Sequence, residues 1–171
     1  MKTSFKVLPL IASLAAVSAF AQTPAEITPP AGNKAAMTLS ATGILNYECK
    51  AVADKPGTFA WTFAGPDAKL WDANKKEVGK YYGGPTWEST DGSKVTGKQL
   101  AVSPSVAGAI PLQLVQAAPT TGTGAMADVT YIQRLKTVGG VAPATPACAA
   151  GNVGAKTTAG YTADYVFFKK G

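Results

Sequence analysis

Residues 39–50 read LSATGILNYECK, and they give the clearest indication of the fold class. Apart from Gly43, the odd-numbered positions carry apolar side chains, and apart from Ile44, the even-numbered positions carry polar ones. This period of two is typical of a β-strand that buries one of its faces. Cys49 belongs to the apolar set, so its side chain is expected to point into the protein.

Further β-rich segments follow along the chain, each bounded by Gly, Pro, Asn or Asp. They are residues 59–63, 69–72, 77–82, 87–90, 94–102, 110–116, 129–136 and 161–168. Asp91-Gly92 predicts a tight hairpin turn between two of them, because both residues tolerate positive φ. The 18 glycines and 12 prolines leave no window for a convincing amphipathic helix. About nine short strands predict an all-β fold, either an antiparallel β-sandwich or a small closed barrel, with long Gly/Pro-rich loops.

The N-terminal stretch predicts export. Lys2 and Lys6 form a short basic region before an uncharged, mostly apolar run over residues 7–20, as in a secretory signal peptide. Small side chains at Ala19 and Ala21 predict cleavage after Ala21. The run is shorter than the roughly 20 residues that a membrane-spanning helix needs, so no transmembrane anchor is expected in the mature chain. The protein is therefore expected in the periplasm or outside the cell.

The mature chain is expected to hold one domain. Residues 22–37 contain three prolines and no periodicity, which predicts an extended lead-in, and residues 38–171 form the all-β domain. Cys49 and Cys148 are the two cysteines of the chain. An even pair in an exported protein favours a disulfide, which would tie the first strand to the last third of the sequence.

The composition excludes several classes of protein. The net charge of +6 falls to +4 once Lys2 and Lys6 are removed. The remaining basic residues are scattered, whereas nucleic-acid binders gather theirs on one face, so no nucleic-acid partner is expected. The chain has no histidine, which excludes nucleophiles activated by histidine and the commonest metal sites. Phosphate-binding and dinucleotide-binding motifs are also absent, so the sequence predicts no cofactor and no metal.

Paired carboxylates are the one catalytic device that this composition leaves available. The pool consists of Asp67, Asp72, Glu77, Glu88 and Asp91. Asp72 and Glu88 each follow a tryptophan at matching positions in two similar hairpins, so both could lie beside aromatic platforms. This pattern gives a carboxylate-dependent hydrolase as an alternative function, and a solvated hairpin edge is the simpler interpretation. No residue is assigned as catalytic.

Aromatic residues are dense between positions 61 and 87. Those predicted to contact a ligand are Tyr81, Tyr82 and Trp87, which flank a Gly-Gly-Pro loop, together with Trp71. Exposed aromatic faces can stack on sugars or carry a protein interface. Trp61 and Phe63 share one face of a strand and are expected in the core, because large aromatic side chains dominate the burial of a small domain.

Arg134 is the one arginine of the chain. Its planar guanidinium suits a bidentate pair with a carboxylate such as Glu88 or Asp164, which would clamp two strands together. The functional alternative is an anion-binding group at the same position.

Several short motifs occur in a characteristic order. They are Tyr47-Glu48-Cys49, Trp61-Thr62-Phe63, Leu70-Trp71-Asp72, Gly84-Pro85-Thr86-Trp87, Asp91-Gly92-Ser93 and residues 129–135. Their order and spacing resemble the domain-of-unknown-function family 3455, small exported bacterial proteins with fungal relatives. The resemblance runs from about Ile27 to Phe168, and it implies one exported domain without supplying an activity, a ligand or catalytic residues. A histidine commonly stands in that family where this chain has Tyr81, so an activity that used the imidazole would not carry over.

Together these features favour a non-enzymatic exported protein. We expect it to bind a cell-envelope or extracellular ligand, such as a glycan, through its aromatic hairpin loops. The alternatives are the carboxylate-dependent hydrolase and a small outer-membrane barrel, for which the aromatic strand at residues 161–168 would be typical. A hydrolase of the two-carboxylate type needs its acids on opposite sides of a cleft, roughly 5 to 9.5 Å apart.

Overall fold

The structure is a computed structural model that describes residues 23–120, 122–144 and 146–171. The expected signal peptide, residues 1–21, lies outside the described residues. Within the described ranges, the helical segments are two short 3-10 helices, η1 (Ala25–Ile27) and η2 (Ala150–Asn152). No helix in that part of the chain is long and apolar enough to cross a membrane.

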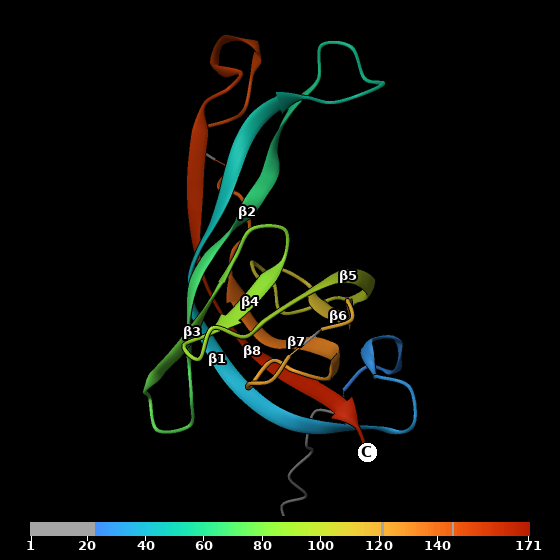
Figure 1. The fold of residues 1–171 in the computed structure, drawn as a ribbon. Helices are drawn as coiled ribbons and strands as arrows, with labels where there is room; N and C mark the ends of the chain where they lie inside the picture. The colour runs from blue at the N-terminus through green and yellow to red at the C-terminus, as the bar shows by residue number, and fades with distance from the viewer. Residues whose placement is uncertain (1–22, 121, 145) are drawn as a thin grey trace, which may run out of the picture.

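The strands form one antiparallel sheet that closes on itself. In chain order they are β1 (Asn33–Ala51), β2 (Phe59–Trp71), β3 (Glu77–Tyr82), β4 (Thr86–Ser89), β5 (Lys94–Ser103), β6 (Leu112–Ala117), β7 (Val129–Gly139) and β8 (Lys156–Lys170). Each strand pairs with the next along the chain, and β8 pairs with β1, so the sheet is a closed barrel (Figure 1). The predicted all-β class is confirmed, and of the two predicted architectures the barrel is the one that forms.

The described residues hold eight strands rather than about nine, because residues 59–63 and 69–72 both belong to β2. Gly65 and Pro66 lie between those segments without ending the strand. Pro66 has a neighbouring strand on one side only, since β3 pairs with β2 from Asp67 onward. Its missing N–H therefore removes no bond from a second ladder, which is the position in which a sheet tolerates proline.

Three strand ends extend beyond the barrel and form a second feature, which we call the arm. It consists of residues 44–51 of β1, 59–66 of β2 and 156–160 of β8. Figure 1 shows these strands rising together from one end of the barrel. Cys49 in the arm forms the predicted disulfide with Cys148, and their Cα atoms are 5.3 Å apart. The bridge fastens the loop of residues 146–155, which precedes β8, to the arm.

The barrel interior is packed with aromatic side chains. Trp87 is fully buried, with its ring stacked on Tyr81 at 4.7 Å between centroids. The rings of Tyr165 and Phe167 meet it edge-on at 5.5 and 6.4 Å. The expectation that Tyr81 and Trp87 are exposed is therefore wrong. They face each other across β3 and β4, and the closure of the sheet turns this shared face into the barrel interior.

The residues before the barrel lie against its outer wall. Ile27 of η1 is fully buried, and its carbonyl accepts a hydrogen bond of 2.7 Å from Nε2 of Gln133. The hydroxyl of Ser103 donates to Oε1 of Glu26 at 2.6 Å. β1 begins at Asn33, so its first residues come from the segment that the sequence predicted as a lead-in.

The loop of residues 122–128 lies against the other end of the barrel core from the arm. Met126 from this loop is fully buried and belongs to the barrel core. The predicted hairpin turn at Asp91 holds the loop in place, because its carboxylate accepts hydrogen bonds of 2.6 Å from the Ser93 hydroxyl and 2.7 Å from the Ala125 N–H. These bonds, with the Ser93 side chain contributing most, lower the pKa of Asp91 below its ordinary value of 3.8.

Replacing Asp91 with alanine should lower the melting temperature by a few degrees at neutral pH, because the loop under the barrel loses its anchor. A carboxylate with a depressed pKa stabilises the fold above its unfolded pKa, and this contribution disappears as the pH falls through the folded value. The difference between the wild type and Asp91→Ala should therefore shrink once the pH drops below about 4.

Thermal unfolding followed by circular dichroism between pH 7 and pH 2 would measure this difference. Asp67→Ala is the matched control, because Asp67 is exposed and forms no ion pair with the described residues. We expect that variant to unfold at nearly the same temperature as the wild type at neutral pH. A gap between wild type and Asp91→Ala that stayed constant with pH would contradict the role of the ionised carboxylate.

Candidate functional site

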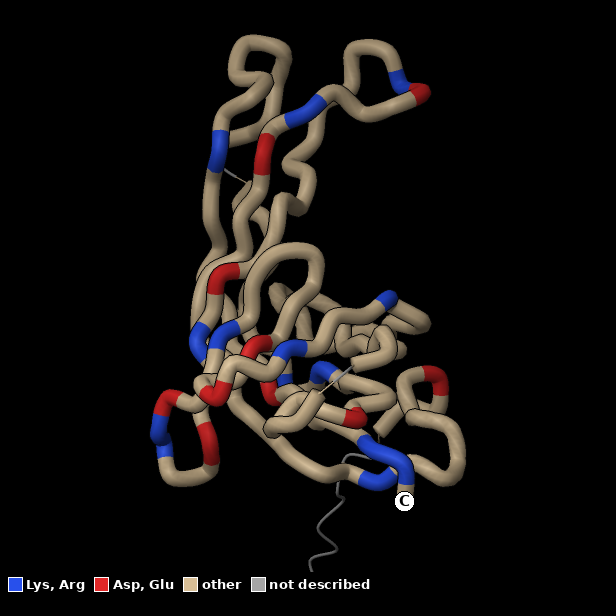
Figure 2. The backbone as a smooth tube through the Cα atoms, in the orientation of Figure 1, with Lys and Arg blue, Asp and Glu red and all other residues tan. Residues whose placement is uncertain are grey.

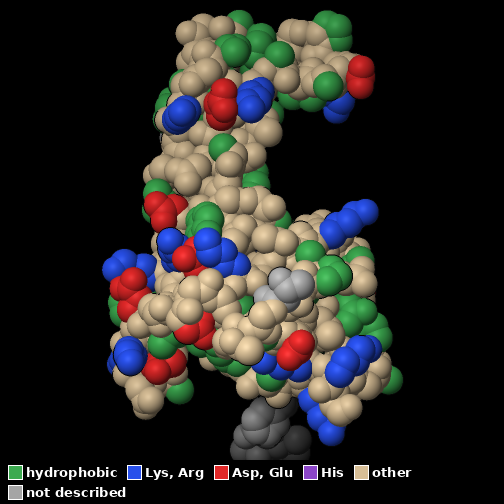
Figure 3. All heavy atoms as spheres, in the orientation of Figure 1, with side chains coloured by type: hydrophobic (Ala, Val, Ile, Leu, Met, Phe, Trp, Pro, Cys, Tyr) green, Lys and Arg blue, Asp and Glu red, His purple; other side chains and the backbone are tan. Residues whose placement is uncertain are grey.

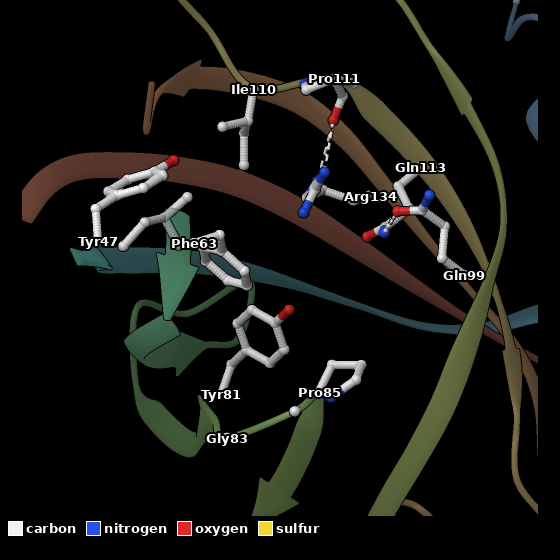
Figure 4. A pocket seen from close by; sticks show the side chains of 12 residues that line it. Tyr47, Phe63, Tyr81, Gly83, Pro85, Gln99, Ile110, Pro111, Gln113 and Arg134 are labelled. Atoms are coloured by element: carbon white, nitrogen blue, oxygen red, sulfur yellow. Dashed lines mark hydrogen bonds between the residues drawn. The ribbon is translucent and has the colours of Figure 1, made fainter. Parts of the chain in front are cut away.

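The other end of the barrel opens into a cavity of about 340 Å³, which we call the cup. Its walls come from Leu45 and Tyr47 of β1, Phe63 of β2, Tyr81 of β3, the turn at residues 83–85, Gln99 of β5, Ile110, Pro111, Gln113 of β6 and Arg134 of β7 (Figure 4). Phe63 reaches the cup from the arm, and Figure 3 shows the arm overhanging a hollow beside the barrel. A barrel of about eight strands can hold one small ligand when its side chains do not fill it.

Aromatic rings form one wall of the cup. Tyr47 is buried, and its hydroxyl donates a hydrogen bond of 2.5 Å to the carbonyl of Gly140. Its ring meets Phe63 edge-on, with centroids 5.9 Å apart. Phe63 is 53% exposed, so the prediction that it lies in the core is wrong. A register shift beside Asn46 marks a bulge at the base of the arm, where the barrel wall that would have covered Phe63 has ended.

Trp61, the other aromatic residue expected in the core, is half-buried and packs against the core cluster. It lies opposite Cys49 in the arm. Its indole N–H donates to the carbonyl of Pro146 at 3.1 Å, so this side chain helps the disulfide to hold the loop against the arm. Trp61 does not line the cup.

Arg134 brings a positive charge to the cup. Its Nε and Nη2 atoms donate to the carbonyl of Pro111 at 3.1 and 2.9 Å, which fixes the plane of the guanidinium. A guanidinium has more donors than these bonds use, and those that remain are free to meet a ligand. Beside it, Nε2 of Gln113 donates to Oε1 of Gln99 at 2.5 Å. Figure 4 shows the guanidinium and the Tyr81 hydroxyl turned toward the same space.

The carboxylate partners expected for Arg134 lie elsewhere. Glu88 pairs with Lys94 at 3.3 Å, and Asp164 pairs with Lys136 at 2.8 Å. Arg134 forms no ion pair with any residue that the structure describes. The strand-clamp prediction is wrong, because Arg134 points into the barrel and both acids point outward. Glu88 follows the inward Trp87, and Asp164 precedes the inward Tyr165.

Two further tyrosines, Tyr161 and Tyr165, belong to the barrel core and do not line the cup. The hydroxyls of Tyr161 and Tyr165 are buried and make no hydrogen bond with the described residues. Burial raises the pKa of Tyr81, Tyr161 and Tyr165 above the ordinary value of 10.0, so all three stay protonated. The charge of Arg134 opposes part of each increase, which indicates that the guanidinium lies within electrostatic reach of all three groups.

Of the four predicted ligand contacts, Tyr81 alone lines the cup. Trp87 lies beneath it in the core. Tyr82 and Trp71 are half-buried on the outer side of the barrel, under the ammonium groups of neighbouring lysines. Tyr82 also donates a hydrogen bond of 2.5 Å to Glu88. The two hairpins that look alike in sequence therefore present their tryptophans on opposite sides of the barrel wall.

The acids of the hydrolase hypothesis do not meet at the cup. Oδ1 of Asp72 accepts hydrogen bonds of 2.8 and 2.9 Å from the backbone of Asn74 and Lys76, so it shapes a turn. Glu88 lies on the outer wall among lysines. Figure 2 shows acidic and basic residues interspersed along the chain. The described residues contain no group of three or more His, Cys, Asp or Glu side chains that could hold a metal ion.

Most residues that line the cup were not predicted from the sequence. Tyr47 and Leu45 carried a usable signal, because their alternation placed them on the buried face of β1. Gln99, Gln113 and Pro111 carried none, because an amide or a proline at the end of a strand has no periodic signature that marks a cavity. Their convergence depends on how the closed barrel brings strand ends together.

Comparisons with known proteins place the chain in a family without assigning a reaction. Neither the curated proteins nor the solved structures contain a match to it. The family described as "Protein of unknown function (DUF3455)" matches residues 30–169, which cover all eight strands of the barrel except the last residue of β8. The chain therefore belongs to the DUF3455 family, as its motifs suggested.

Proposed function

We propose that this protein is an exported, non-enzymatic binding protein that takes one small ligand into the cup. The observation that carries the proposal is the asymmetry of the barrel. Met126 and its loop fill one end, whereas the other end opens into a cavity of about 340 Å³ lined by aromatic and aliphatic side chains. Binding sites for small molecules are typically concave and mostly apolar, with a few placed polar groups.

Export is supported by the basic and apolar N-terminal sequence and by the disulfide, which oxidising compartments favour. The non-enzymatic assignment is supported by the cup's lining, whose polar side chains are phenols, amides and one guanidinium. A glycan would have to insert a terminal ring into the cup, because Tyr81 and Trp87 offer no exposed platform for a polymer.

The proposal predicts saturable binding of N-phenyl-1-naphthylamine, a neutral apolar probe that fluoresces when it leaves water. Phe63→Ala should weaken this binding about tenfold, because it removes an aromatic wall that a bound apolar ring would contact. Phe63 is largely exposed, so the fold should tolerate the change. Fluorescence titration of the mature protein would measure the affinity and the stoichiometry.

Val138→Ala is the control for this experiment, because Val138 is 61% exposed and does not line the cup. Its affinity for the probe should match that of the wild type within about twofold. Binding that never saturates, or that weakens equally in both variants, would show that the probe meets general apolar surface and would count against the cup as a binding site.

A further inference from the structure

In the described part of the chain, the one charged side chain that lines the cup is positive, and it has hydrogen-bond donors to spare. Arg134 has no carboxylate partner among the described residues, and its remaining donors face a cavity with mostly apolar walls. Arg134 is half-buried, so its guanidinium is partly removed from water, and an anion held by direct hydrogen bonds would restore part of the lost interaction. The bonds to Pro111 already hold the guanidinium in one orientation, so little conformational entropy remains to be lost on binding.

The buried phenols add a second, independent observation. Tyr165 lies directly opposite Arg134 in the ladder between β7 and β8, and its side chain is fully buried. Its hydroxyl and that of Tyr161 make no hydrogen bond with the described residues, and neither residue is among those that line the cup. Among these phenols, Tyr81 is the one that lines the cup beside Arg134, and its hydroxyl can orient its proton toward a negative charge held there. Acidic side chains are absent from the lining described above.

We propose that the cup recognises a small carboxylic acid with an apolar or aromatic body, whose carboxylate pairs with the guanidinium of Arg134. The body of the ligand would lie against Phe63, Ile110 and the turn at residues 83–85, with its acidic end toward β7. Arg134 suits this role because its planar fork matches the two oxygens of a carboxylate. This inference rests on the proposed function, since it names the class of ligand for the same cup.

The test compares 3-phenylpropionate with 3-phenylpropanamide as competitors of bound N-phenyl-1-naphthylamine at neutral pH. The two molecules have nearly the same shape and differ in charge. With wild-type protein, the acid should displace the probe at a concentration about tenfold lower than the amide. In Arg134→Gln the two midpoints should coincide, and Arg134→Lys should retain only part of the preference, because it keeps the charge but loses the fork.

Lys170→Gln is the matched control for net charge, since this exposed lysine ends β8 and does not line the cup. It should leave the preference for the acid unchanged. If the probe binds and the acid displaces it no better than the amide, the carboxylate inference is overturned while the proposed function stands. Failure of both competitors to displace a bound probe overturns the inference as well. If the probe itself does not bind saturably, the proposed function fails.

Discussion

Replacing Trp87 with alanine should lower the free energy of unfolding by about 3–5 kcal/mol, the usual cost of truncating a fully buried large aromatic residue. The indole is completely buried and packs against Tyr81, Tyr165 and Phe167. Its removal would leave a cavity between β4 and β8 that these rings cannot fill without leaving their own contacts. Urea denaturation of the mature protein, followed by far-ultraviolet circular dichroism, measures the loss.

Trp71→Ala provides the comparison, because Trp71 has the corresponding position in the other, similar hairpin but lies half-buried outside the barrel. We expect that substitution to cost about 1 kcal/mol or less. The difference between the two losses of stability therefore shows which tryptophan faces the barrel interior. Equal losses, or a larger loss for Trp71, would mean that β4 does not turn Trp87 inward, and the barrel register would have to be revised.

The sequence predicted the fold class because its evidence is local. The alternation over residues 39–50 is a property of a single strand with one buried face, and the structure buries Leu39, Ala41 and Cys49 as that pattern predicts. The turn at Asp91-Gly92 is equally local, since it depends on the backbone preferences of two adjacent residues. Neither feature needs information about which strands meet across the barrel.

The candidate site depends on information that no short segment contains. Trp71 and Trp87 have similar neighbours in sequence, yet only the closure of the sheet decides which one faces inward. Phe63 pairs with the buried Tyr47 and shares its inward face, but it lies in the arm, beyond the part of the barrel wall that would have covered it. Arg134 was recognised as a candidate anion-binding group, but its surroundings come from segments far apart in the chain, including Tyr47 and Ile110.

Replacing Cys49 and Cys148 together with serine should lower the free energy of unfolding by about 2–5 kcal/mol. The bridge joins residues 99 positions apart, and for a loop of about 100 residues the chain-entropy model gives roughly 4.7 kcal/mol. It also supports the loop of residues 146–155, which meets Cys49 through two backbone hydrogen bonds of 2.9 Å, from Cys49 N to Ala155 and from Gly154 N to Cys49. Urea denaturation of the mature chain would measure this loss.

Wild-type protein unfolded in the presence of a reductant is the internal control, because it lacks the bridge but keeps both sulfur atoms. If the bridge acts by restricting the unfolded chain, the reduced wild type and the double variant should lose similar stability. A loss confined to the serine variant would instead reflect a polar hydroxyl at the fully buried position of Cys49. Oxidising compartments favour disulfides, so we expect protein recovered outside the cytoplasm to contain no free thiol. An exported chain with free thiols would contradict the stabilising role of the bridge.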